Sequence, residues 1–171
     1  SAPTSFGKTT SVFEYISRNK DNLNKIITIV PTNSLKMEYF IKLQGILAQT
    51  HKVIDNDGHI EDEKFCLVLT HEKFIECFLE YKDYIKDIDL VVIDEIYKLK
   101  NEKDEDRIYS MSLAYLTTIK IAKQFIFMGP FIKSTTFPGI DKEHIVLNYF
   151  YSPDIILIIY SVSIFAISLW K

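Results

Sequence analysis

The stretch Ala2-Pro3-Thr4-Ser5-Phe6-Gly7-Lys8-Thr9 decides the fold of this chain. Its Gly-Lys-Thr ending is typical of a phosphate-binding loop, in which backbone N–H groups at a helix N-terminus hold phosphate groups. In such a loop the lysine reaches the β- and γ-phosphates and the hydroxyl group binds Mg²⁺, roles that fall here to Lys8 and Thr9. The predicted nucleotide-binding residues are Thr4, Ser5, Phe6, Gly7, Lys8, Thr9 and Thr10.

A second stretch, Val91-Val92-Ile93-Asp94-Glu95, is an apolar run that ends in two carboxylates. A buried strand with this ending delivers one acid to a nucleotide-bound metal ion and a second acid to the attacking water. We therefore expect Asp94 and Thr9 to bind Mg²⁺. The expected catalytic residues are Glu95, as general base, and Lys8. The alternative, a pair of surface or helix-capping acids, fits poorly with the apolar run before it.

These two stretches together resemble motifs of the first RecA-like domain of superfamily 2 helicases, closest to the DEAD/DEAH-box and DExH groups. Two stretches between them also resemble motifs of that family, Val30-Pro31-Thr32-Asn33-Ser34-Leu35 and Leu69-Thr70-His71-Glu72-Lys73-Phe74. The resemblance implies ATP and Mg²⁺ as cofactors. It also implies contact with the backbone of a DNA or RNA strand through Pro31, Thr32, Asn33, Thr70, His71 and Glu72.

The residues themselves leave a second interpretation of these two turns open. Thr and Asn favour the first position of a helix, so both turns could serve only as caps between a strand and a helix. Hydroxyls and backbone N–H groups at helix starts are also what binds a phosphodiester chain without reading its sequence.

Three positions depart from the family pattern. Ala2 stands where the general loop pattern has its first glycine, a substitution that these helicases commonly show. Tyr97 stands where the family usually has Asp or His, and Phe127-Met128-Gly129-Pro130-Phe131 lies where Ser-Ala-Thr is normally found. The last two changes fall on motifs that couple hydrolysis to strand movement in the family.

Short β-branched runs alternate with helical patterns along the chain, which is the signature of βαβ units on a parallel sheet. We therefore predict an α/β, RecA-like P-loop domain over residues 1–153, with a mostly parallel sheet flanked by helices. A phosphate-binding loop normally follows directly on a buried strand, and this sequence begins at the loop itself. We therefore expect the usual first strand to be lacking. The predicted strands are 25–30, 64–69, 89–93, 124–128 and 144–149, and the predicted helices are 9–19, 34–47, 72–85 and 108–122.

Residues 154–171 form an apolar tail, because no charged residue occurs between Ile155 and Trp170. Three interpretations remain open. The run is slightly shorter than the ~18 residues that span a bilayer, so it could be a membrane anchor. It could instead be a helix or a pair of strands in the core, or an unselected tail that a frame change introduced after about Pro153.

Composition limits the classes of function. A hydrophobic fraction of 47% excludes a disordered chain. The net charge of -3 provides no overall basic field, so any contact with nucleic acid must be local. Cys66 and Cys77 lack the spacing of a zinc site and are expected to be small buried residues in a reducing, cytoplasmic compartment.

The sequence thus predicts the ATP-binding motor domain of an ATP-dependent DNA or RNA helicase or translocase. In the resembling family ATP binds between two RecA-like domains and the second domain supplies an arginine, so we expect this chain to be inactive without a second domain from a longer parent chain. The alternative is a non-catalytic nucleotide- or nucleic-acid-binding module, tethered to a membrane by the tail. A small-molecule kinase fits less well, because adjacent Asp and Glu suit a water nucleophile.

Overall fold

The computed structural model describes residues 6–55, 60, 62–95, 105–130, 144–148 and 154–160, with side chains at 9–55, 60, 62–95 and 108–128. Its centre is one sheet with the strand order β2-β3-β1-β4-β5-β7-β6. The strands are β1 (Lys25–Val30), β2 (Lys52–Ile54), β3 (Phe65–Thr70), β4 (Ile88–Ile93), β5 (Ala122–Pro130), β6 (His144–Asn148) and β7 (Asp154–Tyr160). The helices are α1 (Phe6–Asn19), α2 (Asn33–Leu47), α3 (His71–Glu80) and α4 (Glu105–Ile121).

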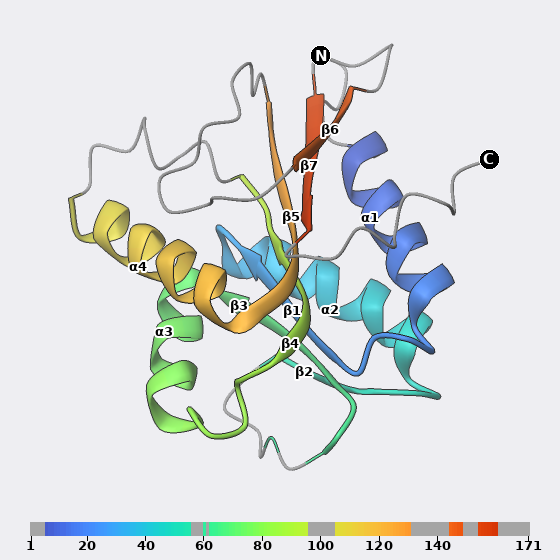
Figure 1. Ribbon diagram of the computed structural model, residues 1–171, viewed down its shortest axis with the longest axis horizontal. Coiled ribbons are helices and arrows are strands. Elements are labelled where there is room, and N and C mark those ends of the chain that lie inside the picture. Colours follow the sequence, from blue (N-terminus) through green and yellow to red (C-terminus); the bar gives the residue numbers. More distant parts are fainter. Residues whose placement is uncertain are drawn as a thin grey trace.

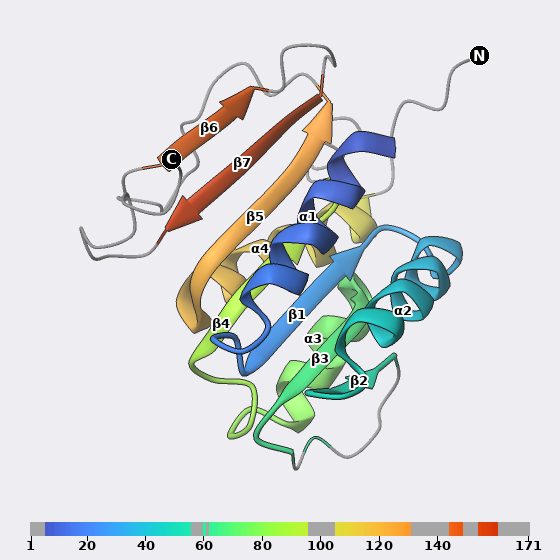
Figure 2. The same ribbon diagram turned by 90° about the vertical axis from the view of Figure 1, so that its right-hand side faces the viewer.

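Strands β1 to β5 are parallel to one another, and β7 and β6 continue the sheet in antiparallel fashion beyond β5. Figure 2 shows β7 pointing against its neighbour β5. Parallel neighbours joined by helices are the expected outcome of βαβ units, in which the crossover helix covers a face of the sheet. The predicted α/β class with a mostly parallel sheet is therefore confirmed.

Helices cover the parallel part of the sheet on both faces. Figure 1 shows α3 and α4 on one side and α1 and α2 on the other. Side chains alternate along each strand, so β1 sends Ile27 and Ile29 toward the α3–α4 side, and Ile26 and Val30 toward α1 and α2. Burial on both faces explains why this strand is an unbroken apolar run in the sequence.

Helical periodicity located α2 and α3 correctly, but several apolar residues in them lie outside the buried face. In α2 the buried residues are Tyr39, Leu43 and Leu47, whereas Ile41 is 63% exposed. In α3 the apolar residue Leu79 is 72% exposed. Helix α3 also ends at Glu80 instead of near residue 85, because a tight turn begins there with the Tyr84 N–H donating to the Tyr81 carbonyl.

Two strands were not assigned from the sequence. The three residues of β2 are too few to show a period of two. Residues 154–160 of the apolar tail form β7, which lies between β5 and β6 in the sheet. For these residues, the interpretation as a strand in the core is the one that agrees with the structure. Residues 161–171 lie outside the described part of the chain. Among the described helices, none combines the length and apolar character needed to cross a bilayer.

Both cysteines are buried, as expected for small apolar side chains: Cys66 is 0% exposed and Cys77 1%. Burial raises the pKa of the Cys66 thiol far above its usual range, so this thiol is unreactive. One polar side chain deep in the sheet, Thr28, donates a hydrogen bond of 3.1 Å to the Leu67 carbonyl, which compensates its burial.

Asp89 fastens the amino ends of the central strands. Its Oδ2 accepts hydrogen bonds from the backbone N–H groups of Asn24 (2.8 Å) and Lys25 (3.1 Å), and its Oδ1 pairs with Lys123 Nζ at 2.7 Å. These contacts join β1, β4 and β5 at one end. Burial alone would raise the pKa of Asp89, but the Lys123 ammonium and the two backbone donors outweigh it and hold the pKa below its usual range.

Asp89→Ala should lower the free energy of unfolding at pH 7 by about 1–2 kcal/mol, because backbone donors lose a charged acceptor. Since the folded-state pKa lies below the ordinary 3.8, this stabilisation is complete above pH 3.8 and is lost as the pH falls through the folded-state pKa. Urea unfolding at a series of pH values measures the difference between the two proteins.

Asp83→Ala is the matched control, because Asp83 is an exposed aspartate close to the same end of the sheet. Its effect should stay within about 0.5 kcal/mol at every pH. A difference between wild type and Asp89→Ala that is absent at neutral pH, or unchanged in acid, would show that the ionised carboxylate does not stabilise the strand ends.

Candidate active site

The carboxyl ends of β1, β3 and β4 meet at one edge of the sheet. Strand register places Val30 beside Thr70 and Ile29 beside Ile93, so the turns that follow these three strands are neighbours. Figure 2 shows that α1 also begins at this edge. Each motif predicted from the sequence thus has a described element at the edge where open α/β sheets bind their ligands.

Asp94, the first residue after β4, is held by its backbone and by both carboxylate oxygens. Its N–H donates to the Ile29 carbonyl at 2.9 Å, which extends the pairing of β4 with β1. Its Oδ1 accepts from the N–H of Glu95 at 2.8 Å, and its Oδ2 accepts from the hydroxyl of Tyr39 at 2.9 Å. The half-buried carboxylate therefore has a defined orientation.

Glu95 has a left-handed backbone, with φ 55°. This conformation costs a non-glycine residue roughly 1–2 kcal/mol, and glutamate lacks the short side chain that lets Asp or Asn tolerate it. The same turn brings the Glu95 N–H to Asp94 Oδ1 and leaves the Glu95 side chain half-buried. Strain of this kind is concentrated at functional sites, where the surrounding structure imposes it.

Thr9 lies one turn into α1 and is half-buried. Its hydroxyl lies near the hydroxyl of Tyr39, the group that donates to Asp94. The structure thus brings the two predicted metal ligands, Thr9 and Asp94, close to a tyrosine that the sequence analysis did not single out. Tyr39 itself is 1% exposed.

Thr32 and Thr70 cap the two helices that leave this edge. Thr32 Oγ1 accepts from the N–H of Leu35 at 3.3 Å, and Thr70 Oγ1 accepts from the N–H of Lys73 at 3.4 Å. Both threonines therefore act as N-caps of the helices that follow them. Capping does not exclude a phosphodiester contact, since Thr32 and its neighbour Asn33 are also exposed.

The other predicted strand-contacting residues differ in exposure. Pro31 is buried, and together with His71 and Asp94 it lines a narrow cavity beneath the edge. His71 is 3% exposed, and its Nε2 lies 2.8 Å from Oε1 of the exposed Glu72. A strand lying on this surface would meet Glu72 before His71.

Some predicted residues cannot be placed in the same detail. Thr4, Ser5 and Tyr97 lie outside the described residues. Phe6, Gly7 and Lys8 form the first turn of α1, described by its backbone alone, and Thr10 follows as an exposed residue.

The donor set at this edge fits Mg²⁺. A carboxylate and a hydroxyl are hard oxygen ligands, and Mg²⁺ is usually held by one or two carboxylates together with phosphate oxygens and water. Thr9 and Asp94 offer both kinds of oxygen within reach of a single hydroxyl, that of Tyr39. No group of three or more His, Cys, Asp or Glu side chains in the described part of the chain forms a second type of metal site.

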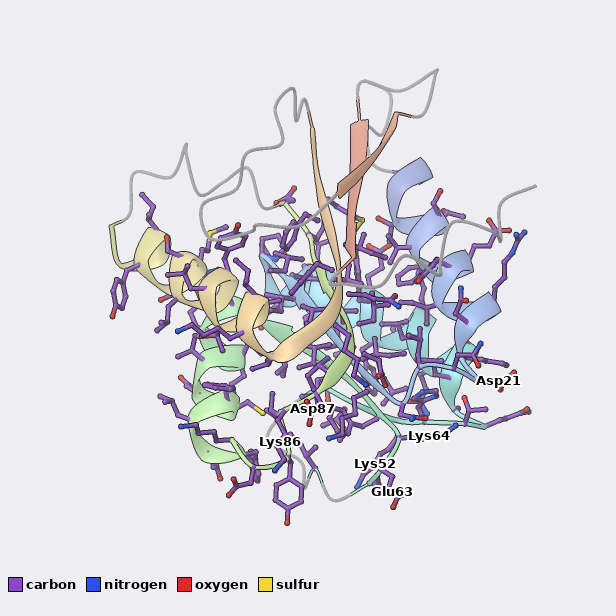
Figure 3. The ribbon with its side chains drawn as sticks, viewed as in Figure 1. Asp21, Lys52, Glu63, Lys64, Lys86 and Asp87 are labelled. Carbon is purple, nitrogen blue, oxygen red and sulfur yellow. The ribbon has the colours of Figure 1, made fainter. Side chains whose placement is uncertain are left out.

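The opposite end of the sheet has a different character. Figure 3 labels six charged side chains there, Asp21, Lys52, Glu63, Lys64, Lys86 and Asp87. Three are acidic and three are basic, so this end presents mixed charge.

A signal for Tyr39 was present in the sequence. Tyr39, Leu43 and Leu47 are spaced by four residues, which places them on one helix face. The competing apolar residues Phe40 and Ile41 obscured this register. Periodicity could have predicted that Tyr39 is buried, but not that its hydroxyl meets Asp94, because that contact joins residues 55 positions apart.

Comparison with known proteins agrees with this geometry. A sequence model of the family described as DEAD/DEAH box helicase matches residues 1–138. A curated relative, Anti-bacteriophage protein B of Escherichia coli (strain K12), is 30% identical in an alignment over 151 residues that covers 83% of this chain. The chain spans about a fifth of the length of that relative, since the match covers 20% of it. The match over residues 1–138, with the parallel sheet and the acidic pair at its edge, shows that this chain belongs to the DEAD/DEAH box helicase family.

Proposed function

We propose that this chain binds Mg-ATP at the carboxyl edge of its sheet and forms one half of the ATPase site of a helicase or translocase. The family supports an ATP-binding, helicase-type motor domain. The observation that carries the assignment of residues is the hydrogen bond of 2.9 Å from Tyr39 to Asp94, with Thr9 close to the same hydroxyl. It brings the start of α1 close to the end of β4 at the edge where nucleotide would lie.

Each residue has a specific part in this proposal. Backbone N–H groups in the first turn of α1 would hold the phosphates, and Lys8 has the role of contacting the β- and γ-phosphates. Thr9 and Asp94 would hold Mg²⁺, which would supply neutralisation of phosphate charge. Glu95 orients the attacking water and accepts its proton. The caps of α2 and α3, with Thr32, Asn33, Thr70 and Glu72 at their surface, face the backbone of a DNA or RNA strand.

We infer that hydrolysis needs a second domain. An arginine that stabilises the transition state is worth roughly 10³–10⁵ in rate in related NTPases, and in the resembling family a second RecA-like domain supplies it. The chain corresponds to 20% of the length of its E. coli relative, which leaves room for such a domain in a longer parent.

Lys8→Ala should weaken Mg-ATP binding by at least about tenfold, because the lysine contributes a charged contact to the β- and γ-phosphates. Isothermal titration calorimetry of the 171-residue chain measures this change. Glu95→Gln is the matched control, since it keeps side-chain size and should keep the affinity within about twofold while removing the base. Equal affinities of wild type and Lys8→Ala would contradict the proposed nucleotide site.

Glu95→Gly should raise the free energy of unfolding by about 0.5–1 kcal/mol, because glycine adopts the left-handed backbone without strain. Urea unfolding tests this expectation. Asp87, also left-handed with φ 52°, provides the control at the other end of the sheet. Asp87→Gly should gain less, since aspartate tolerates this conformation better. If Glu95→Gly lowers the free energy of unfolding, the expectation is wrong. The Glu95 side chain would then stabilise the fold by more than its left-handed backbone destabilises it.

The purified chain should bind Mg-ATP without appreciable hydrolysis, whether or not single-stranded DNA or RNA is added. Release of inorganic phosphate, followed in the presence of each type of strand, measures the turnover. Robust turnover stimulated by nucleic acid, and lost in Glu95→Gln, would show that the second domain is not required.

A further inference from the structure

Tyr39 is unusual among the core residues of α2 because its polar end reaches the active site. The ring packs edge-on against Phe13 of α1, with centroids 5.0 Å apart and planes at 69°. On the same helix face, Leu43 and Leu47 are also buried. The ring is therefore fixed between α1, α2 and the sheet, and the hydroxyl has little freedom to move.

The hydroxyl of Tyr39 lies beside polar groups of two different elements. It donates to Asp94 Oδ2 at 2.9 Å. The Thr9 hydroxyl lies near it. Because a phenol has one proton and that proton is directed at Asp94, the tyrosine oxygen can only accept from Thr9.

These positions suit a metal site. A threonine hydroxyl that donates its proton to a tyrosine oxygen keeps its lone pairs for other partners, and only lone pairs can bind a cation. A carboxylate oxygen has more than one acceptor position, so the hydrogen bond from Tyr39 does not by itself exhaust Oδ2.

Packing alone does not account for a tyrosine at this position. Phenylalanine would fill the same space against Phe13, and it would not require a buried hydroxyl to find partners. A ligand-orienting partner outside the coordination sphere, by contrast, typically changes metal affinity by 10–100-fold. This comparison favours a role in which the hydroxyl acts on the two ligands.

We propose that Tyr39 is the positioning residue of the magnesium site, whose hydroxyl sets the relative placement of the Thr9 hydroxyl and the Asp94 carboxylate before the ion binds. This inference rests on the proposed nucleotide site and extends it to a residue in none of the motifs that the resemblance supplies. It assigns Tyr39 to the Mg²⁺-dependent part of nucleotide affinity and not to contact with nucleotide.

Tyr39→Phe in the 171-residue chain tests the proposal. A fluorescent ADP analogue is titrated first in EDTA and then at increasing Mg²⁺ concentrations. Affinity in EDTA should stay within about twofold of wild type, whereas the Mg²⁺ concentration for half-maximal effect should rise by about tenfold or more. Electron paramagnetic resonance of Mn²⁺ in the presence of ADP should show the same weakening without reference to turnover.

Tyr15→Phe is the matched control. Tyr15 lies on α1, packs against the same core cluster, and donates from its hydroxyl to Gln124 Oε1 at 2.8 Å, so its replacement also removes one partly buried hydrogen bond. It should leave the Mg²⁺ dependence unchanged. Replacement of Tyr39 with 4-aminophenylalanine, which returns an N–H donor to the ring, should restore Mg²⁺ dependence to within about threefold and covers the case in which Tyr39→Phe folds poorly.

The outcomes separate this inference from the function on which it rests. If wild type binds Mg-nucleotide and Tyr39→Phe shows the wild-type Mg²⁺ dependence, the positioning role is wrong and the nucleotide site stands. If Tyr15→Phe shifts the Mg²⁺ dependence as much as Tyr39→Phe, the effect is one of general stability and the positioning role is again wrong. If wild type does not bind nucleotide with Mg²⁺, both the site and the role of Tyr39 are wrong.

Discussion

The parallel pairing of β4 with β1 is the constraint on which the active site depends. It continues one residue beyond β4, where the Asp94 N–H donates to the Ile29 carbonyl at 2.9 Å. This bond fixes the backbone of Asp94 at the sheet edge, and the Tyr39 hydroxyl then orients its carboxylate. At the other end of the same strands, Asp89 collects backbone donors from Asn24 and Lys25. The two central strands are thus secured at both ends, and their carboxyl end carries the proposed oxygen ligands of the nucleotide site.

The charged residues at the two ends of the sheet have different relations to stability. Asp89 satisfies donors and forms an ion pair, so its charge contributes to folding. Glu95 adopts a left-handed backbone with φ 55°, which costs a glutamate more than the same conformation costs Asp87 at the other end. A structure that tolerates strain beside Asp94 and satisfies its polar groups elsewhere is consistent with a site shaped for chemistry.

The sequence predicted the parallel core because β1, β3, β4 and β5 are buried on both faces and therefore read as apolar runs. It also suggests the ligands, because Gly7-Lys8-Thr9 and Asp94-Glu95 are local motifs, and their roles stay a prediction. It could not predict β7, because an apolar run does not reveal whether its partner is a bilayer, a helix or a distant strand such as β5. The position of the Tyr39 hydroxyl could not be predicted for a related reason. Thr9 and Asp94 are far from Tyr39 in the sequence, and only the folded chain brings them close to it.

Hydrogen–deuterium exchange of the chain with and without ADP and Mg²⁺ tests the central claim most directly. The account predicts added protection at the start of α1, at the turn after β1 and at Asp94 and Glu95, with no change around Asp62, Glu63 and Lys64 at the far end of the sheet. Protection confined to that far end, or no protection at saturating nucleotide, would contradict a nucleotide site at the carboxyl edge.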